Sequence, residues 1–378
     1  QHRVLIRLYL SVGIFFLLFF YGIFIFLFLK NPTQWYRLGQ LVQYFRLPID
    51  TALLLLLAWG LRRWMKKGSR RNNILLATIL LVTWLIPAFY SPGNVQRGAL
   101  PEKPRLMAHR GAASLAPENT ITAMQAAADI GIHGLETDIT VSNDGVLFLM
   151  HDSTLARTTD VAQVFPGRED DPADTFSWDE LSQLNAGSWF DGQTEYPNES
   201  IPTLEALLPL VRDNDLYFIY DLRIPPAGHP YSDQALNLCL EQIKAADVMD
   251  HTWILVKPEE IDQVRLILPE AILAAGIGNS DQPPAPVALV ADGYQVVNST
   301  YNLSNGKIKA YQDAGLWVNL WVVDETWQYS RLWLAGADSV TSNYVQTFAI
   351  MSHPIGVITP AIHLAVWGVV GLLATWLH

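Results

Sequence analysis

Two histidines follow strand-like runs in the middle of the chain. His109 comes directly after the run 105–108, and His151 comes directly after the apolar run 146–150. An imidazole accepts and donates protons near neutral pH, so a pair of them can serve as general base and general acid. The two positions predict an acid/base pair at the ends of two strands.

Carboxylates and an arginine accompany the histidines. Glu136 and Asp138 are two residues apart, so in a strand their side chains share one face. Their hard oxygen atoms favour Mg²⁺ or Ca²⁺. Arg110 can pair with an anionic oxygen in a forked geometry. One divalent ion, an arginine and two histidines together suit the cleavage of a phosphate ester.

The same stretch resembles the signature of the glycerophosphodiester phosphodiesterase family. The resemblance covers about residues 103–352, roughly two thirds of the chain, and so many ordered matches make it specific. The matching residues are His109-Arg110-Gly111, Pro117-Glu118-Asn119-Thr120, Glu136-x-Asp138, Asp144-Gly145, His151-Asp152, Arg157-Thr158-Thr159, Leu184 to Phe190, Ile201 to Leu204, Asp221-Leu222-Arg223 and Val318 to Val323.

The resemblance implies hydrolysis of glycerophosphodiesters to glycerol phosphate and an alcohol. It implies that His109 and His151 are the acid/base pair, without saying which is the acid. It also implies that Glu136, Asp138 and Asp221 hold one divalent cation, Ca²⁺ or Mg²⁺. The family usually has Glu-x-Lys where this chain has Asp-Leu-Arg, so the third ligand here is a shorter acid.

Further site residues follow from the same resemblance. Arg110 and Arg223 are expected to hold phosphate oxygens, although Arg223 has a purely structural role as its alternative. Trp321 either forms a wall of the substrate pocket or packs inside the barrel. The segment 341–343 lacks the acid that simpler soluble relatives often have near the last strand, so a site role there is open. The run 221–226 resembles the multi-pass membrane branch of the family.

Strand-like and helix-like runs alternate after residue 104. This alternation predicts an α/β fold with a parallel sheet, and nearly eight units in about 250 residues match a (β/α)₈ TIM barrel. Residues 160–201 break the rhythm and predict a small insertion. Strands are expected at 105–109, 134–141, 146–150, 216–222, 253–257, 271–275, 294–298, 316–323 and 338–342, and helices at 119–130, 203–212, 232–247, 259–268, 305–314, 326–335 and 344–352.

Charge is divided unevenly along the chain. Residues 1–97 carry 12 lysines and arginines and one acid, a net charge of +11. Because the whole chain has a net charge of −11, the remainder has a net charge of −22. An acidic domain joined to a basic apolar segment does not indicate nucleic-acid binding. It indicates a part that contacts the lipid bilayer and a separate globular part.

Four apolar runs are predicted to be transmembrane helices: Val4–Leu29, Leu47–Leu61, Ile74–Tyr90 and Val357–Leu377. The second is short, and a re-entrant or interfacial segment is its alternative. The expected domains are a membrane region at 1–97 with about three transmembrane helices, a linker at 98–104, the barrel at 105–353 and a C-terminal transmembrane helix at 354–378. The basic cluster at 62–71 is expected in the cytoplasm, so the barrel is expected outside it, at the cell surface or in the periplasm.

Other functions remain open at this point. A lysophospholipase D, or a phospholipase C-type enzyme that cleaves phosphoinositides or glycolipid anchors, would use the same groups on a lipid headgroup. A membrane receptor or scaffold would be marked by loss of a histidine or a metal carboxylate, and none is lost. A transporter has little support, because the chain has only about four expected spans and they show no pattern of intramembrane charges. The sequence specifies no oligomeric state.

Overall fold

Eight parallel strands close into a barrel in the part of the chain that the structure describes. The computed structural model describes residues 74, 78, 94–190, 196–280 and 282–376. Its strands are β1 (Arg105–His109), β2 (Gly134–Val141), β3 (Leu147–Leu149), β4 (Tyr217–Leu222), β5 (Thr252–Leu255), β6 (Ile272–Gly278), β7 (Val296–Thr300), β8 (Trp317–Trp321) and β9 (Ser339–Ser342). Neighbouring strands follow the order β1-β9-β8-β7-β6-β5-β4-β2, and β1 also pairs with β2, which closes the ring. Only β3 is antiparallel to its neighbour, β2.

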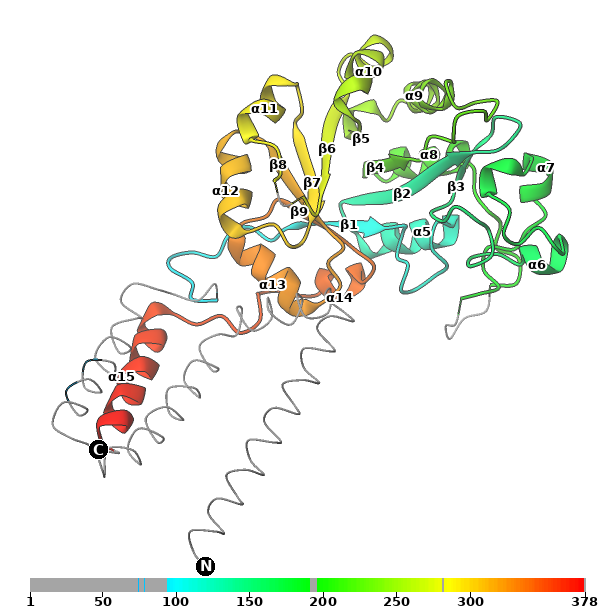
Figure 1. Cartoon of the computed structure of the whole chain (residues 1–378). Coiled ribbons are helices and arrows are strands. Elements are labelled where there is room, and N and C mark those ends of the chain that lie inside the picture. Colours follow the sequence, from blue (N-terminus) through cyan, green and yellow to red (C-terminus); the bar gives the residue numbers. More distant parts are fainter. Residues whose placement is uncertain (1–73, 75–77, 79–93, 191–195, 281, 377–378) are drawn as a thin grey trace, which may run out of the picture. The chain divides into compact units, whose positions relative to one another are not determined.

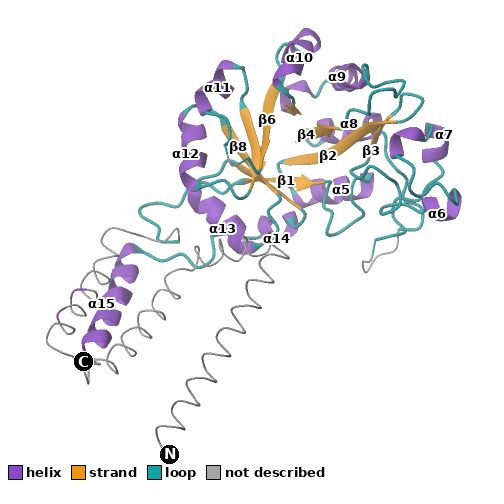
Figure 2. Cartoon of the chain, in the orientation of Figure 1, coloured by secondary structure: helices purple, strands orange, loops and turns teal. Residues whose placement is uncertain are grey.

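A helix follows each barrel strand, and these helices surround the strands (Figure 1; Figure 2). They are α5 (Ile121–Ile130), α8 (Leu204–Asp213), α9 (Ala235–Ala246), α10 (Ile261–Ile267), α11 (Pro286–Ala291), α12 (Asn305–Asp313), α13 (Thr326–Ala335) and α14 (Val345–Ala349). This architecture confirms the predicted (β/α)₈ barrel. The helix α11 was not predicted from the sequence, because it has six residues and exposes Val287 and Val290 to solvent. An outward-facing valine hides the amphipathic pattern by which a helix is recognised.

Side chains alternate along each strand between the inside of the barrel and the surrounding helices, as the pleat requires. In β1, Leu106 and Ala108 belong to the large core between strands and helices, whereas Met107 belongs to a second cluster. That second cluster fills the barrel and comprises Met107, Ile219, Trp253, Ala274 and Val296. In each of these strands, the residue two positions later also faces the inside of the barrel. It lies at the carboxyl end of the strand, where TIM barrels hold their sites.

The segment between β3 and α8 interrupts the regular alternation, as expected for residues 160–201. It contains α6 (Val161–Val164), a 3₁₀ turn at Ala173–Thr175 and α7 (Trp178–Leu181). Its apolar side chains form a small core of their own, which includes Leu155, Val161, Phe176 and Leu181. The insertion is therefore packed on its own apolar residues and leaves the barrel strands undisturbed.

The barrel lies within one compact unit, Leu100–Ile355, and Gln1–Ala99 with Gly356–His378 form the other. In the described part of the second unit, Val95 pairs with Ile358 and α15 covers Pro360–Trp376. No helix within the described residues is long and apolar enough to cross a membrane. The expected C-terminal span at 357–377 stays a prediction, because α15 reaches the last described residue and residues 377–378 lie outside the described part of the chain.

The other three expected spans fall almost wholly outside the described residues. Of the runs 4–29, 47–61 and 74–90, the structure describes only Ile74 and Thr78. The predicted membrane region at 1–97 therefore stays a prediction.

Candidate active site

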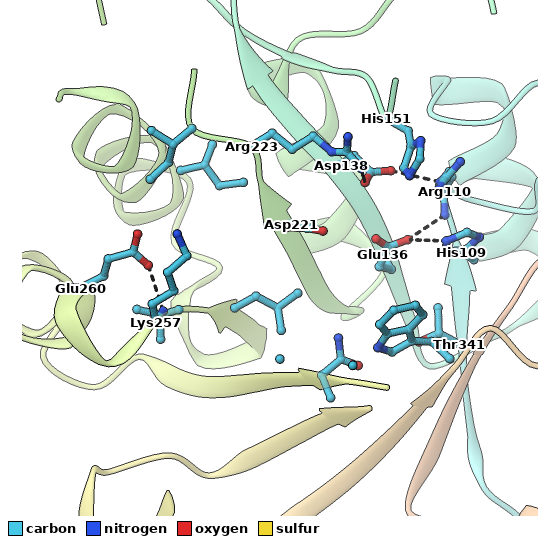
Figure 3. A pocket seen from close by; sticks show the side chains of 18 of the residues that line it. His109, Arg110, Glu136, Asp138, His151, Asp221, Arg223, Lys257, Glu260 and Thr341 are labelled. Carbon is cyan, nitrogen blue, oxygen red and sulfur yellow. Dashed lines mark hydrogen bonds and ion pairs between the residues drawn. The ribbon is translucent and has the colours of Figure 1, made fainter. Parts of the chain in front are cut away.

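One cavity at the carboxyl ends of the barrel strands brings together all the site residues predicted from the sequence. Its volume is about 560 Å³, within the range of small-molecule sites. Polar side chains from β1, β2 and β4 face it from one side (Figure 3). The predicted residues that line it are His109, Arg110, Glu136, Asp138, His151, Asp221, Arg223 and Trp321.

Three carboxylates meet in this cavity from two neighbouring strands. Glu136 and Asp138 both point inward from β2, and Asp221 on β4 is the register partner of Asp138. Burial raises the pKa of Glu136 well above its usual value, and the negative charge of Asp138 adds to this effect. Asp221 is open to the cavity, yet the surrounding protein and the Asp138 charge raise its pKa as well. Such mutual repulsion is what a bound cation offsets.

The predicted metal ligands line the same cavity, but their oxygen atoms do not converge on one common position. The two Asp138 oxygens already have cationic partners: Oδ2 lies 3.1 Å from Arg110 Nε, and Oδ1 lies 3.4 Å from Arg223 Nη2. Within the described ranges, no three carboxylates, imidazoles or thiolates are placed to hold a metal ion. Their oxygen donors suit Mg²⁺ or Ca²⁺, and Asp138 is the one of the three that also contacts both arginines.

Arg110 occupies a strained turn that aims its guanidinium into the cavity. Its φ is +55° and that of Gly111 is +81°, and a Cβ on Gly111 would lie 2.6 Å from the Ala123 backbone. The Arg110 backbone N–H donates to Glu136 Oε2 at 3.1 Å, and Nη1 donates to Glu118 Oε1 at 2.9 Å. The turn after β1 thus requires glycine at position 111. It places the Arg110 guanidinium between the carboxylates of Glu118 and Asp138.

His109 is held by an amide that the sequence analysis did not assign. Its Nδ1 lies 2.8 Å from Asn343 Oδ1, and Asn343 Nδ2 donates to Asp324 Oδ2 at 2.9 Å. Because Asp324 orients this amide, its oxygen faces the imidazole, and Nδ1 carries the proton. Nε2 is then left unprotonated, 3.8 Å from Glu136 Oε2. Burial, together with the Arg110 charge, lowers the pKa of His109 against the opposing effect of Asn343.

His151 is held by a carboxylate instead. Its Nδ1 lies 2.6 Å from Asp152 Oδ1, and Arg157 Nε donates to Asp152 Oδ2 at 2.5 Å. The Arg157 hydrogen bonds, together with that of His151, hold the pKa of Asp152 far below its usual value. His151 thus has a negatively charged partner beside its ring, whereas His109 has a neutral amide.

Arg157 joins the two histidine environments. Besides Asp152, it donates through Nη2 to Glu118 Oε1 at 2.6 Å, and Glu118 in turn accepts from Arg110. Burial raises the pKa of Glu118, but Arg157 and Arg110 outweigh this effect and hold it below the usual value. The motif residues Glu118, Asp152 and Arg157 thus form one ion-pair network that links His151 to Arg110.

Arg223 and Trp321 complete the predicted set. Besides its contact with Asp138, Arg223 has a side chain that is 39% exposed, so it can also reach a ligand in the cavity. Trp321 lines the cavity from β8, and its buried Nε1 has no hydrogen-bond partner among the described residues. Trp321 thus forms part of the cavity wall, its role toward a substrate stays a prediction, and its indole N–H is available to a ligand.

Three polar lining residues were not predicted from the sequence: Lys257, Glu260 and Asn298. Thr341, in the segment whose site role was left open, lines the cavity as well. Asn298 and Thr341 lie at inward-facing positions of β7 and β9, and this alternation was the only available signal for Asn298. Lys257 and Glu260 follow β5 and line the side of the cavity opposite the histidines (Figure 3).

The arrangement has the parts that phosphoryl chemistry needs. Two guanidinium groups can bind phosphate oxygens, two imidazoles with different partners can move protons in opposite directions, and three carboxylates supply negative oxygen donors. All of these groups line one cavity.

Comparisons with known proteins agree with this chemistry. Human glycerophosphoinositol inositolphosphodiesterase GDPD2 is 37% identical over 345 residues, which cover 85% of this chain and 62% of that protein. Chicken glycerophosphodiester phosphodiesterase domain-containing protein 5 is 33% identical over 335 residues, which cover 84% of this chain and 55% of that protein. The chain thus spans little more than half the length of these relatives.

A solved structure shares the fold. A phosphodiesterase from Oleispira antarctica, solved in complex with the product sn-glycerol-3-phosphate, is 25% identical with a TM-score of 0.57. The match covers 65% of this chain and 96% of that one. Residues 109–347 match the model of one family, and the chain belongs to the glycerophosphoryl diester phosphodiesterase family.

Proposed function

We propose that this chain is a metal-dependent phosphodiesterase that hydrolyses glycerophosphodiesters to glycerol phosphate and an alcohol. The observation that supports it most is the convergence of two histidines and two arginines around three carboxylates in one cavity. The product named in the Oleispira antarctica complex is of the same chemical class.

Glu136, Asp138 and Asp221 would hold one divalent cation, Ca²⁺ or Mg²⁺. The donor set fits such an ion, since all three are oxygen ligands whose charges repel one another at close range. When bound, the ion would supply a positive charge that stabilises the phosphate oxygens. Arg110, released from Asp138, would then be free to bind the phosphate together with Arg223.

The proton transfers follow from the partners of the two histidines. His109, with an amide partner and a free Nε2, accepts the proton of a glycerol hydroxyl as that oxygen attacks phosphorus. His151, with its carboxylate partner, donates a proton to the leaving alcohol as the bond between phosphorus and the alcohol oxygen breaks. Water then attacks the resulting cyclic phosphate, the bond to the glycerol hydroxyl opens, and the histidines exchange roles.

The test is a panel of phosphodiesters with purified full-length chain, analysed by phosphorus NMR. We expect glycerol phosphate as the product, loss of activity with a chelator, and recovery on addition of Ca²⁺ or Mg²⁺. Release of phosphatidic-acid-type product would favour a lysophospholipase D, and diacylglycerol with a phosphorylated headgroup would favour a phospholipase C. Full activity in chelator would contradict the metal requirement.

We further propose that the N-terminal apolar runs anchor the enzyme in a membrane with the barrel on the extracytoplasmic side. The support is the sequence: the runs 4–29 and 74–90 are long enough to span a bilayer, the run 47–61 is shorter, and the basic cluster 62–71 marks the cytoplasmic loop. A cysteine placed in this loop should stay unlabelled by an impermeant reagent applied to intact cells. Labelling from outside would contradict the orientation.

A further inference from the structure

Three asparagines of the barrel domain begin the pattern Asn-x-Ser/Thr, in which x is not proline. The tripeptides are Asn198-Glu199-Ser200, Asn298-Ser299-Thr300 and Asn302-Leu303-Ser304. In proteins exposed outside the cytoplasm, this pattern marks the asparagines that accept N-linked glycans. Because the glycan is bulky and polar, the side chain that carries it must reach solvent in the folded protein. The structure therefore distinguishes the three candidates by the surroundings of each side chain.

Asn298 and Asn302 are both held by neighbouring side chains. Asn298 lies on β7 and is 8% exposed, and its Oδ1 accepts a hydrogen bond from Asn319 Nδ2 at 2.8 Å inside the barrel. A sugar joined to Asn298 would have to fit inside the barrel, so a molecule modified there could not close the ring. Asn302 is half-buried, and its Nδ2, the atom that would carry the sugar, donates to Asn279 Oδ1 at 3.2 Å.

Asn198 is placed differently, in a turn of the segment between α7 and α8. Its side chain is exposed and forms no hydrogen bond with a described residue. The backbone beside it is fixed, because Asn185 Nδ2 donates to the Pro197 carbonyl at 2.6 Å and Ser200 pairs with Asn185. Ser200 is exposed as well. The turn thus holds the tripeptide at the surface, with the Asn198 amide nitrogen turned to solvent.

We infer that Asn198 is an N-glycosylation site and that Asn298 and Asn302 are not. The inference rests on the proposed extracytoplasmic position of the barrel and is independent of the phosphodiesterase chemistry. The sugar donor is an oligosaccharide joined to a lipid through pyrophosphate, and a membrane-bound transferase of the cell catalyses the transfer. The Asn198 amide nitrogen loses one proton and forms a bond to the anomeric carbon of the first sugar. The bond from that carbon to the pyrophosphate oxygen breaks, and the lipid pyrophosphate leaves with the bonding electrons.

The experiment expresses the full chain in a eukaryotic host that attaches N-linked glycans. We expect the wild type to carry one glycan, seen as a single gel shift that peptide N-glycosidase removes. Asn198→Gln and Ser200→Ala should each lose this shift completely, and Asn302→Gln should keep it. Enzymatic removal converts the accepting asparagine to aspartate, so peptide mass spectrometry identifies the position. A glycan found on Asn298 or Asn302, or a shift that persists in Asn198→Gln, would overturn the inference.

A variant with a new acceptor separates the inference from the membrane topology. Asp250 is exposed, and Asp250→Asn completes the same pattern with His251 and Thr252. We expect this variant to show one more shift than the wild type. If Asp250→Asn is modified while the wild type is not, the barrel reaches the glycosylating compartment and the assignment of Asn198 alone is overturned. If neither protein is modified, the extracytoplasmic placement fails and the inference fails with it. Phosphodiester cleavage by the same preparations tests the proposed activity separately.

Discussion

Replacing His109 or His151 with alanine should lower kcat about 1,000-fold, while the protein keeps its fold. Both side chains end apolar strand runs and point into the same cavity, and neither supports the packed core. Loss of a general acid or base typically costs 10²- to 10⁴-fold. The measurement is single-substrate kinetics with glycerophosphoinositol, with circular dichroism and thermal unfolding as checks of folding.

The control for these variants is His353→Ala. His353 is exposed and its recorded hydrogen bond is with its neighbour Ser352, so the variant should be as active as the wild type. Near-normal rates in both His109→Ala and His151→Ala would remove the histidines from the mechanism altogether.

A partial loss of kcat should show that the ion-pair network of Glu118, Asp152 and Arg157 positions His151. Arg157→Met removes the partner of Asp152 and Glu118 without touching either histidine, so kcat should fall about tenfold with KM less affected. Arg168→Met is the matched control, because Arg168 also pairs with two carboxylates, Asp171 and Glu180, but lies in the insertion away from the cavity. An equal loss in both variants would mean that the insertion, not His151, is affected.

Replacing Glu136 with glutamine should abolish turnover and yet raise the stability of the metal-free protein. Burial and the Asp138 charge raise the pKa of Glu136 above its unfolded value, so its contribution to stability is lost as the pH rises through the folded pKa. At neutral pH the ionised form of this buried carboxyl therefore costs stability, and a neutral amide of the same shape removes that cost. We expect Tm in chelator to rise by about 3 °C, roughly 1 kcal/mol.

Added metal should reverse the order of stability. In the wild type, Ca²⁺ or Mg²⁺ at 100 times its dissociation constant should stabilise the fold by about 2.7 kcal/mol, and Glu136→Gln should lose most of this gain. Thermal unfolding with and without metal measures both effects. A variant that is less stable in chelator, or that gains as much from metal as the wild type, would show that Glu136 is a structural residue and not a ligand.

Much of the barrel could be predicted because its signals are local. Each strand is a short apolar run between polar or glycine-rich segments, and its bounds differ by few residues from those expected. The exception, α11, has a six-residue pattern in which Val287 and Val290 face solvent. The motif residues were also local signals, since His109 ends β1, whose carboxyl end meets those of the other parallel strands at one edge. His151 follows the antiparallel strand β3 and reaches the cavity because β3 pairs with β2.

The sequence by itself determined the types of the reacting groups and the face from which each points, because side-chain alternation in a strand is a property of the local backbone. Tertiary structure alone decided their partners. Asn343 reaches His109 only because β9 closes the barrel beside β1, and Asp138 meets Asp221 only through the register of β2 and β4. The tertiary structure also placed Arg110 and Arg223 beside the Asp138 oxygens and Lys257 at the cavity. These outcomes depend on distances between residues far apart in the chain, which ring closure sets and no local pattern encodes.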